Sequence, residues 1–226
     1  MSIPQREPLR DTPHTRRLPV YWLTVVALAH CGPPRPLTDA GPDVPEFVLG
    51  DAACNGAVVR RSEQPSPHQT PGSEIAFRDN PPTNGPHYSD WARWGIYREV
   101  IPRGYWVHNL EHGAVVLLYR PDVQNSDRDA LEAFVRALPP EPACLAQGVR
   151  RRILVTPDPF LPTPFAAVAW NHSYTALCLD TAALERIVLG LTGRAPEEVC
   201  ATGFYPIETQ PLDGGASPTD ASAPRD

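Results

Sequence analysis

The sequence predicts a single α+β domain, in which a mixed β-sheet is covered by about two helices and long proline-rich loops join the elements. Three observations favour this fold. Short apolar segments bounded by glycine or proline are typical of buried strands, and two other segments carry apolar residues at helical spacing. The 29 prolines among 226 residues disfavour a bundle of long helices. The length suits one core of ordinary size.

Three strands are expected from short runs of apolar, β-branched or aromatic residues. They cover residues 114–119, 153–156 and 165–170, and each run is bounded by glycine or proline. Together with two helices, the order along the chain is strand, helix, strand, strand, helix. This order predicts a mixed sheet with helices packed on it.

Two helices are expected from capping residues that precede apolar positions at helical spacing. Ser126 and Asp129 form a capping box before the first helix, which Pro139 ends. Asp180 is expected to cap the second helix, which stops near Gly193. The apolar faces are formed by Leu131, Phe134, Val135 and Leu138 in the first helix and by Leu184, Ile187, Val188 and Leu191 in the second.

The N-terminal residues 1–30 have the pattern of a signal peptide. A pair of arginines precedes the apolar run 20–29, whose length is that of a signal-peptide core. Cys31 follows in a Leu-Ala-His-Cys sequence that resembles a bacterial lipobox, so Cys31 is the candidate lipidation site. His30 stands where a small residue is usual, which leaves lipidation open. The alternative is a cytoplasmic protein with an apolar, disordered N-terminus.

The rest of the chain divides into three parts. Residues 32–48 are rich in proline, aspartate and glycine and form the expected linker, residues 50–204 form the domain, and residues 205–226 form a disordered tail. No apolar run outside the leader is long enough to span a bilayer. We therefore expect an exported protein of the bacterial cell envelope, either a membrane-anchored lipoprotein or a periplasmic or extracellular protein. A lipid anchor is its only expected membrane contact.

The remaining cysteines support export. Their number is even and they form no close CxxC pair, which favours disulfides, although a cysteine ligand to a metal is the alternative. Three pairings are open. The candidates are Cys54, Cys144, Cys178 and Cys200.

The charge of the chain excludes one class of partner. The 20 basic residues are all arginine and are outnumbered by 26 acidic residues, which gives a net charge of −6 and argues against a nucleic-acid-binding face. The run Arg150, Arg151 and Arg152 is expected to serve solubility and to protect a strand edge, with anion binding as the alternative. A protein partner cannot be identified from the sequence.

The most informative side chains precede the first expected strand. Residues 80–88 contain three prolines and an Asn-Gly pair, so they must form a shaped loop, and this loop carries His87. His108, Glu111 and His112 follow within five residues of one another. Imidazoles and carboxylates gathered in this way are candidate metal ligands.

If the second of these segments forms one helical turn, His108 and His112 share a face and can meet one ion, whereas in a strand they would be about 13 Å apart. With His87, three neutral imidazoles could bind zinc or copper, and Glu111 or the more distant His172 could complete the ligand set. The alternative is architectural: the histidines hydrogen-bond the strand entrance and the glutamate fixes a tautomer.

The same segment also matches the H-x-x-E-H pattern of inverzincin peptidases, in which glutamate activates a zinc-bound water. That pattern needs a long helix, whereas Gly113 and an apolar strand follow here. A zinc-dependent hydrolase is therefore the third hypothesis. A transition-metal-binding domain comes first, and a non-catalytic envelope interaction or structural domain comes second.

Two motifs, NPPTNGPHY at 80–88 and VHNLEHG at 107–113, closely resemble the signature motifs of a bacterial family called domain of unknown function 3105. The resemblance covers roughly residues 70–200. It implies an exported or membrane-anchored protein, but no reaction, because the activity of the family is not established. The family's motif positions that it assigns to this chain are His87, His108, Glu111 and His112.

Overall fold

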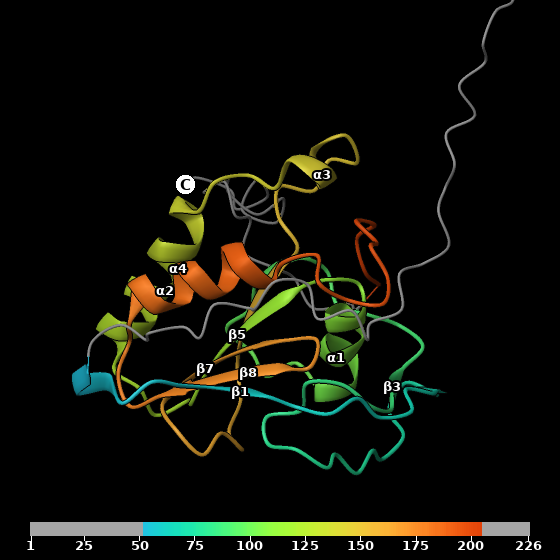
Figure 1. The fold of residues 1–226 in the computed structure, drawn as a ribbon, viewed down its shortest axis with the longest axis horizontal. Helices are drawn as coiled ribbons and strands as arrows, with labels where there is room; N and C mark the ends of the chain where they lie inside the picture. The colour runs from blue at the N-terminus through green and yellow to red at the C-terminus, as the bar shows by residue number, and fades with distance from the viewer. Residues whose placement is uncertain (1–51, 205–226) are drawn as a thin grey trace, which may run out of the picture. The chain divides into compact units, whose positions relative to one another are not determined.

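The computed structural model describes residues 52–204, which are drawn in colour in Figure 1. The expected signal peptide, the candidate lipidation site Cys31, the linker and the C-terminal tail all lie outside the described residues. Within them the α+β prediction is confirmed, because a mixed six-stranded sheet carries helices on both of its faces.

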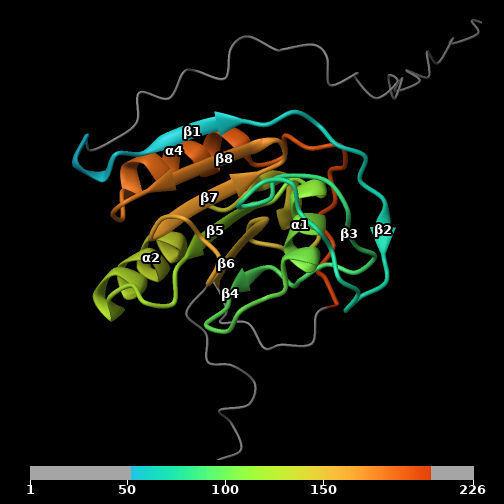
Figure 2. The same ribbon diagram turned by 90° about the horizontal axis from the view of Figure 1, so that it is seen from below.

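The sheet has the strand order β1-β8-β7-β5-β6-β4, which Figure 2 shows from one side to the other. Strand β6 is parallel to its neighbours β5 and β4, and the other neighbouring pairs are antiparallel. The strands are β1 (Ala57–Arg60), β4 (Gly95–Ile96), β5 (Val115–Tyr119), β6 (Ile153–Pro157), β7 (Phe165–Ala169) and β8 (His172–Ala176).

The three predicted strands are the central ones, and their burial explains why the sequence revealed them. Every residue of β5, β6 and β7 is buried, and apart from Thr156 these strands are continuous apolar runs. The flanking strands β8 and β1 carry polar residues and are partly exposed. They were not predicted, because their side chains show neither a continuous apolar run nor a clear alternation.

Helices α2 (Asn125–Ala137) and α4 (Thr181–Leu191) cover one face of the sheet. The Asp180 cap is confirmed, because its carboxylate accepts a hydrogen bond from the amide of Ala183 at 2.9 Å. The capping box at Ser126 is wrong. Helix α2 begins at Asn125 after Gln124 and makes no side-chain cap bond, so Ser126 already lies inside the first turn.

Helix α1 (Arg103–Glu111) packs on the opposite face of the sheet. Side chains of β5 alternate between the two cores: Leu117 packs in the core of α2 and α4, whereas Val116 and Leu118 pack in the core that contains Trp106 and Leu110 of α1. The sheet is therefore the middle of three layers. The sequence indicates only one turn of α1, at 108–112, because most residues of the helix are buried and it has no polar face to reveal its period.

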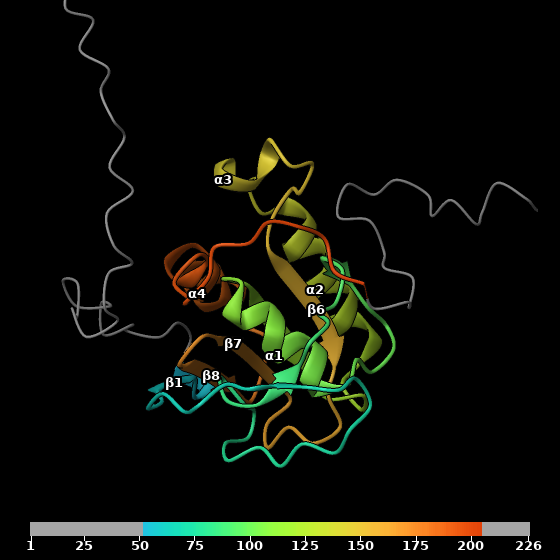
Figure 3. The same cartoon turned by 90° about the vertical axis from the view of Figure 1, so that its right-hand side faces the viewer.

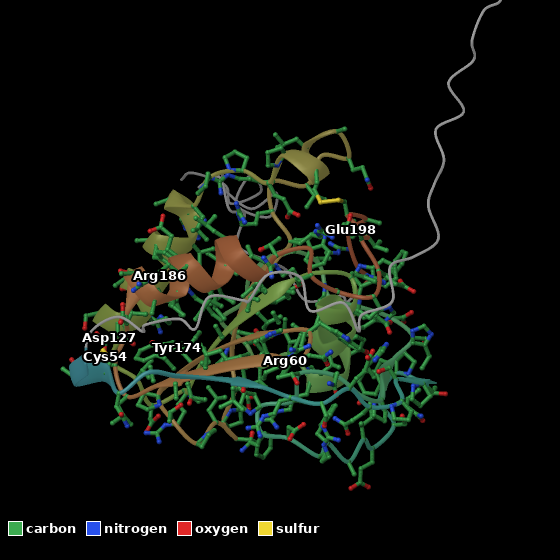
Figure 4. The ribbon with its side chains drawn as sticks, viewed as in Figure 1. Cys54, Arg60, Asp127, Tyr174, Arg186 and Glu198 are labelled. Carbon is green, nitrogen blue, oxygen red and sulfur yellow. A yellow bond between two sulfur atoms is a disulfide. The ribbon has the colours of Figure 1, made fainter. Side chains whose placement is uncertain are left out.

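Two disulfides lie near the two ends of the described chain. Cys54 of the 3-10 turn Ala52–Cys54 is bonded to Cys178, and Cys144 of the short helix α3 (Pro142–Leu145) is bonded to Cys200. Figure 4 shows the second bond in yellow near Glu198. Disulfides are typical of exported proteins. No helix among the described residues is long and apolar enough to cross a membrane.

Candidate metal centre

A pair of two-residue strands places the first two histidines side by side. Strands β2 (His68–Gln69) and β3 (His87–Tyr88) are parallel, and His68 lies directly opposite His87, with their ring centroids 4.9 Å apart. Figure 2 shows β3 between β2 and α1. His87 is fully buried, whereas the side chain of His68 is 54% exposed. One imidazole of the pair therefore lies inside the protein and the other at its surface.

The tautomer of His87 follows from its hydrogen bond. Its Nδ1 lies 2.8 Å from the carbonyl oxygen of Gly85. A carbonyl oxygen only accepts, so Nδ1 carries a proton, and in the neutral ring Nε2 then carries the lone pair. Gly85 has a φ of +100°, a conformation that glycine adopts without strain. The tight turn predicted at the Asn-Gly pair thus fixes the ring of the next histidine along the chain.

Helix α1 supplies His108 in the same state. Its Nδ1 donates to the carbonyl oxygen of Tyr88 at 2.7 Å, so its Nε2 also carries a lone pair. Gly104, one turn earlier, permits this contact, because a Cβ there would lie 2.6 Å from the ring of Tyr88. The absence of a side chain at Gly104 therefore brings β3 close enough to α1 to orient the second buried imidazole.

Four side chains converge into one group. The ligand atoms of His68, His87, His108 and Glu111 all lie within 4.8 Å of one another. Glu111 Oε2 is 3.0 Å from His87 Nε2 and 3.6 Å from His68 Nε2. This geometry could hold a metal ion. It brings together three of the predicted ligands and adds His68, which was not predicted.

The contact between His87 and Glu111 has an electrostatic consequence. His87 Nε2 is buried and makes no hydrogen bond within the described part of the chain. When the ring is neutral with its proton on Nδ1, the lone pair of Nε2 faces a carboxylate oxygen at 3.0 Å. Two electron-rich atoms at this distance repel each other unless a proton or another cation lies beside them.

His112 adjoins this group without belonging to it. It is the C-cap of α1, and its Nε2 lies 3.1 Å from His108 Nε2 and 3.2 Å from Oε2 of Glu197. His172, the other candidate ligand, lies outside the group at the start of β8, where its Nδ1 contacts the carbonyl oxygen of Trp170.

Burial sets the charge state of the site. Desolvation lowers the pKa of His108 and of His112 to about 4, although the carbonyl of Tyr88 opposes the shift at His108. Burial alone would raise the pKa of Glu111, but its contact with His87 and the neighbouring imidazoles lower it overall. At neutral pH His108 and His112 are therefore neutral and Glu111 is ionised, which are the forms that bind metals.

An aromatic side chain closes one flank of the histidines. The ring of Trp91 lies 5.1 Å from that of His108 and 4.6 Å from that of His112, centroid to centroid. The ring of Phe204 also packs on Trp91, with the centroids 5.3 Å apart. The indole thus restricts water on this flank and keeps the two imidazoles in place.

Arg152 holds the end of α1. Its guanidinium donates to the carbonyl oxygen of His112 at 2.8 Å and forms an ion pair with Glu141 at 2.6 Å. Arg151 and Arg152 are 5% and 3% exposed, so the prediction of a solubility role is wrong for both. Arg151 binds the carbonyl oxygen of Pro139. Burial with defined acceptors makes these arginines structural.

Two residues of this region gave no signal in the sequence. His68 belongs to no local spacing pattern, since it meets His87 only through a two-residue strand pair. Glu197 follows α4 and reaches His112 only because its own amide donates to the carbonyl oxygen of Glu111 at 3.1 Å. Neither contact is local in sequence, so only the fold reveals them.

Comparison with known proteins gives one match. The model of a family described as "Protein of unknown function (DUF3105)" matches residues 68–202. The matched range includes every histidine and glutamate of the site described above. No curated protein and no solved structure matches the chain.

Proposed function

Because the chain belongs to the DUF3105 family of unknown function, we propose its function from the site: it is an exported domain that binds a transition metal ion, zinc or copper. The proposed ligands are His68, His87, His108 and Glu111. Metal binding is the proposed function of these side chains, and the rest of the domain holds them in place.

The observation that carries this proposal is the close contact between His87 Nε2 and Glu111 Oε2. Two donors that share one tetrahedral zinc ion, each about 2.0 Å from it, lie about 3.3 Å apart. The distances from Glu111 Oε2 to the Nε2 atoms of His87 and His68 are 3.0 and 3.6 Å, on either side of that value. In the neutral form of His87 the two facing lone pairs repel each other, and a bound metal ion would remove that repulsion.

The ligand chemistry favours zinc or copper. Imidazole suits both metals, and a carboxylate is an ordinary further ligand. The cysteines of the described residues are paired in disulfides, so they supply no thiolate. The half-exposed His68 leaves the proposed ion accessible from solvent. An accessible ion suits a protein that acquires, carries or uses the metal.

Export and tethering belong to the same proposal. The two disulfides favour an oxidising compartment. The signal-peptide pattern at residues 1–30 and Cys31 in its lipobox-like context favour a lipid anchor in the cell envelope. The excess of acidic residues supports the absence of a nucleic-acid partner.

A hydrolase of the inverzincin type receives less support. In that pattern the two histidines hold the zinc and the glutamate acts as the base. Here Glu111 Oε2 faces His87 and His68, and α1 ends at Glu111 instead of continuing through the motif. The geometry suits Glu111 as a ligand.

The test is metal content. The mature protein, purified from the periplasm without a histidine tag, is analysed by elemental mass spectrometry beside His87→Ala, with His172→Ala as a matched control outside the group. We expect bound zinc or copper in the parent and in the control and less metal in His87→Ala, with circular dichroism reporting the fold of each. A folded parent protein that contains neither metal and takes up neither when it is added would overturn the proposal.

A further inference from the structure

We propose that the site takes two transition metal ions, and that Glu197 is a ligand of the second. His68, His87 and Glu111 hold the first ion, and a second set formed by His108, His112 and Glu197 holds the other. This inference rests on the proposed metal-binding function and extends it to a second site with a ligand from a distant segment of the chain.

Two contacts within the second set have the spacing of ligands to one ion. His112 Nε2 lies 3.1 Å from His108 Nε2 and 3.2 Å from Glu197 Oε2. Both distances are close to the value of about 3.3 Å expected between two donors of a tetrahedral zinc ion. These two distances therefore match that spacing at least as well as the two distances from Glu111 in the first set, and each set consists of two imidazoles and one carboxylate.

One ion cannot use all six donors. Structural and catalytic zinc ions in proteins are almost always held by three or four protein ligands. His112 and Glu197 lie outside the group that could surround a single ion. His108 Nε2 has one lone pair because Nδ1 is committed to Tyr88, so it serves one ion only. It lies 3.1 Å from His112 Nε2, and we therefore assign it to the second ion when both are bound.

The backbone of Glu197 is held at the end of α1. Its amide donates to the carbonyl oxygen of Glu111 at 3.1 Å, and the amide of Gly193 donates to that of Gly113 at 2.9 Å. Three residues later Cys200 is bonded to Cys144. Figure 3 shows this segment in red as it leaves α4. The position of Glu197 is thus fixed on both sides, although its side chain is 54% exposed.

Each proposed ion keeps an accessible side. The first has the half-exposed His68 among its ligands and the second has the half-exposed Glu197. Three protein ligands with a remaining open position are the arrangement of zinc sites that bind a further molecule. The pair of ions would therefore be able to receive an external ligand from solvent.

The experiment counts ions. Metal-free protein is titrated with zinc alone by calorimetry, and the equivalents bound are confirmed by elemental mass spectrometry. Glu197→Gln is compared with Glu198→Gln, which removes the neighbouring acidic group on the same segment. We expect two equivalents in the parent and in Glu198→Gln, and one in Glu197→Gln. His112→Ala provides a second variant that is expected to keep one equivalent.

The outcomes separate this inference from the proposed function. A parent protein that binds a single equivalent, or a Glu197→Gln variant that keeps both with unchanged affinity, overturns the second ion and leaves the first in place. A parent protein that binds no zinc and no copper overturns both proposals. Glu197 is half-exposed, so its substitution is expected to leave the thermal melting of the metal-free protein unchanged.

Discussion

Removal of the Cys144–Cys200 disulfide is predicted to reduce the stability of the domain substantially. The bond closes a loop with a sequence separation of 56 residues. The chain-entropy relation gives about 4 kcal/mol of stabilisation for a loop of that length, because the cross-link restricts the unfolded chain. Both cysteines are buried beside Val149, so replacement by alanine exchanges one small apolar side chain for another. The loss should therefore come mainly from the missing cross-link.

The assay is urea unfolding of the metal-free double variant Cys144→Ala/Cys200→Ala, followed by circular dichroism. The matched comparison is Cys54→Ala/Cys178→Ala, whose longer separation of 124 residues corresponds to about 5 kcal/mol. We expect both variants to lose several kcal/mol, with the larger loss in the second. A free energy of unfolding for Cys144→Ala/Cys200→Ala within about 1 kcal/mol of the parent value would refute the reasoning.

The same double variant probes the metal centre. The disulfide holds the segment that carries Glu197, and the first set of ligands does not depend on that segment. Zinc titration of the folded variant should therefore show weaker binding of the second equivalent and unchanged binding of the first. Equal weakening of both would mean that the disulfide acts on the whole domain instead of on this segment.

Three further predictions concern the packing and protonation of α1. Gly104→Ala should weaken zinc binding by at least about tenfold. The new Cβ would lie 2.6 Å from the ring of Tyr88 and would displace the Tyr88 carbonyl that orients the imidazole of His108. Zinc titration measures the affinity, and an unchanged affinity would contradict the prediction. The metal-free protein should lose stability as the pH falls from about 6.5 to about 4. His108 and His112 have a pKa of about 4 in the folded protein, so the unfolded chain binds more protons across that pH range. Urea unfolding at several pH values measures the loss of stability, which should be smaller in His112→Asn. Glu141→Gln should lower the free energy of unfolding by about 3 to 5 kcal/mol, since it leaves the guanidinium of Arg152 buried without its carboxylate partner. Urea unfolding at neutral pH measures this loss, and a loss below about 1 kcal/mol would show that water replaces the carboxylate.

The sequence predicted those parts of the fold whose signals are local. The apolar runs of β5, β6 and β7 and the Asp180 cap of α4 depend on residues that are near one another in the chain. Helix α1 could not be delimited, since residues on all its sides are buried and hydrophobic periodicity needs an exposed face. The capping box at Ser126 failed because a helix start is only weakly determined by composition.

The site was predicted to the extent that its ligands follow one another closely. His108 and Glu111 share one helix, and His87 ends the proline-rich loop beside it. The pairing of His68 with His87 depends on a strand pair of only two residues, which leaves no pattern in the sequence. Glu197 reaches the site through a segment that only the packing of α4 and a disulfide bring there. Long-range geometry of this kind cannot be read from spacing.

The pairing of β1 with β8 determines when the domain can be completed. Residues 57–60 pair with residues 172–175, and Cys54 is bonded to Cys178. A chain that is synthesised or threaded from its N-terminus must therefore keep its first strand unpaired until nearly all of the domain has followed. Contacts this distant in sequence slow folding, because a long loop must close before they form. The first strand of the sheet can therefore pair only after its partner near the end of the domain has followed, and the Cys54–Cys178 bond can form only then.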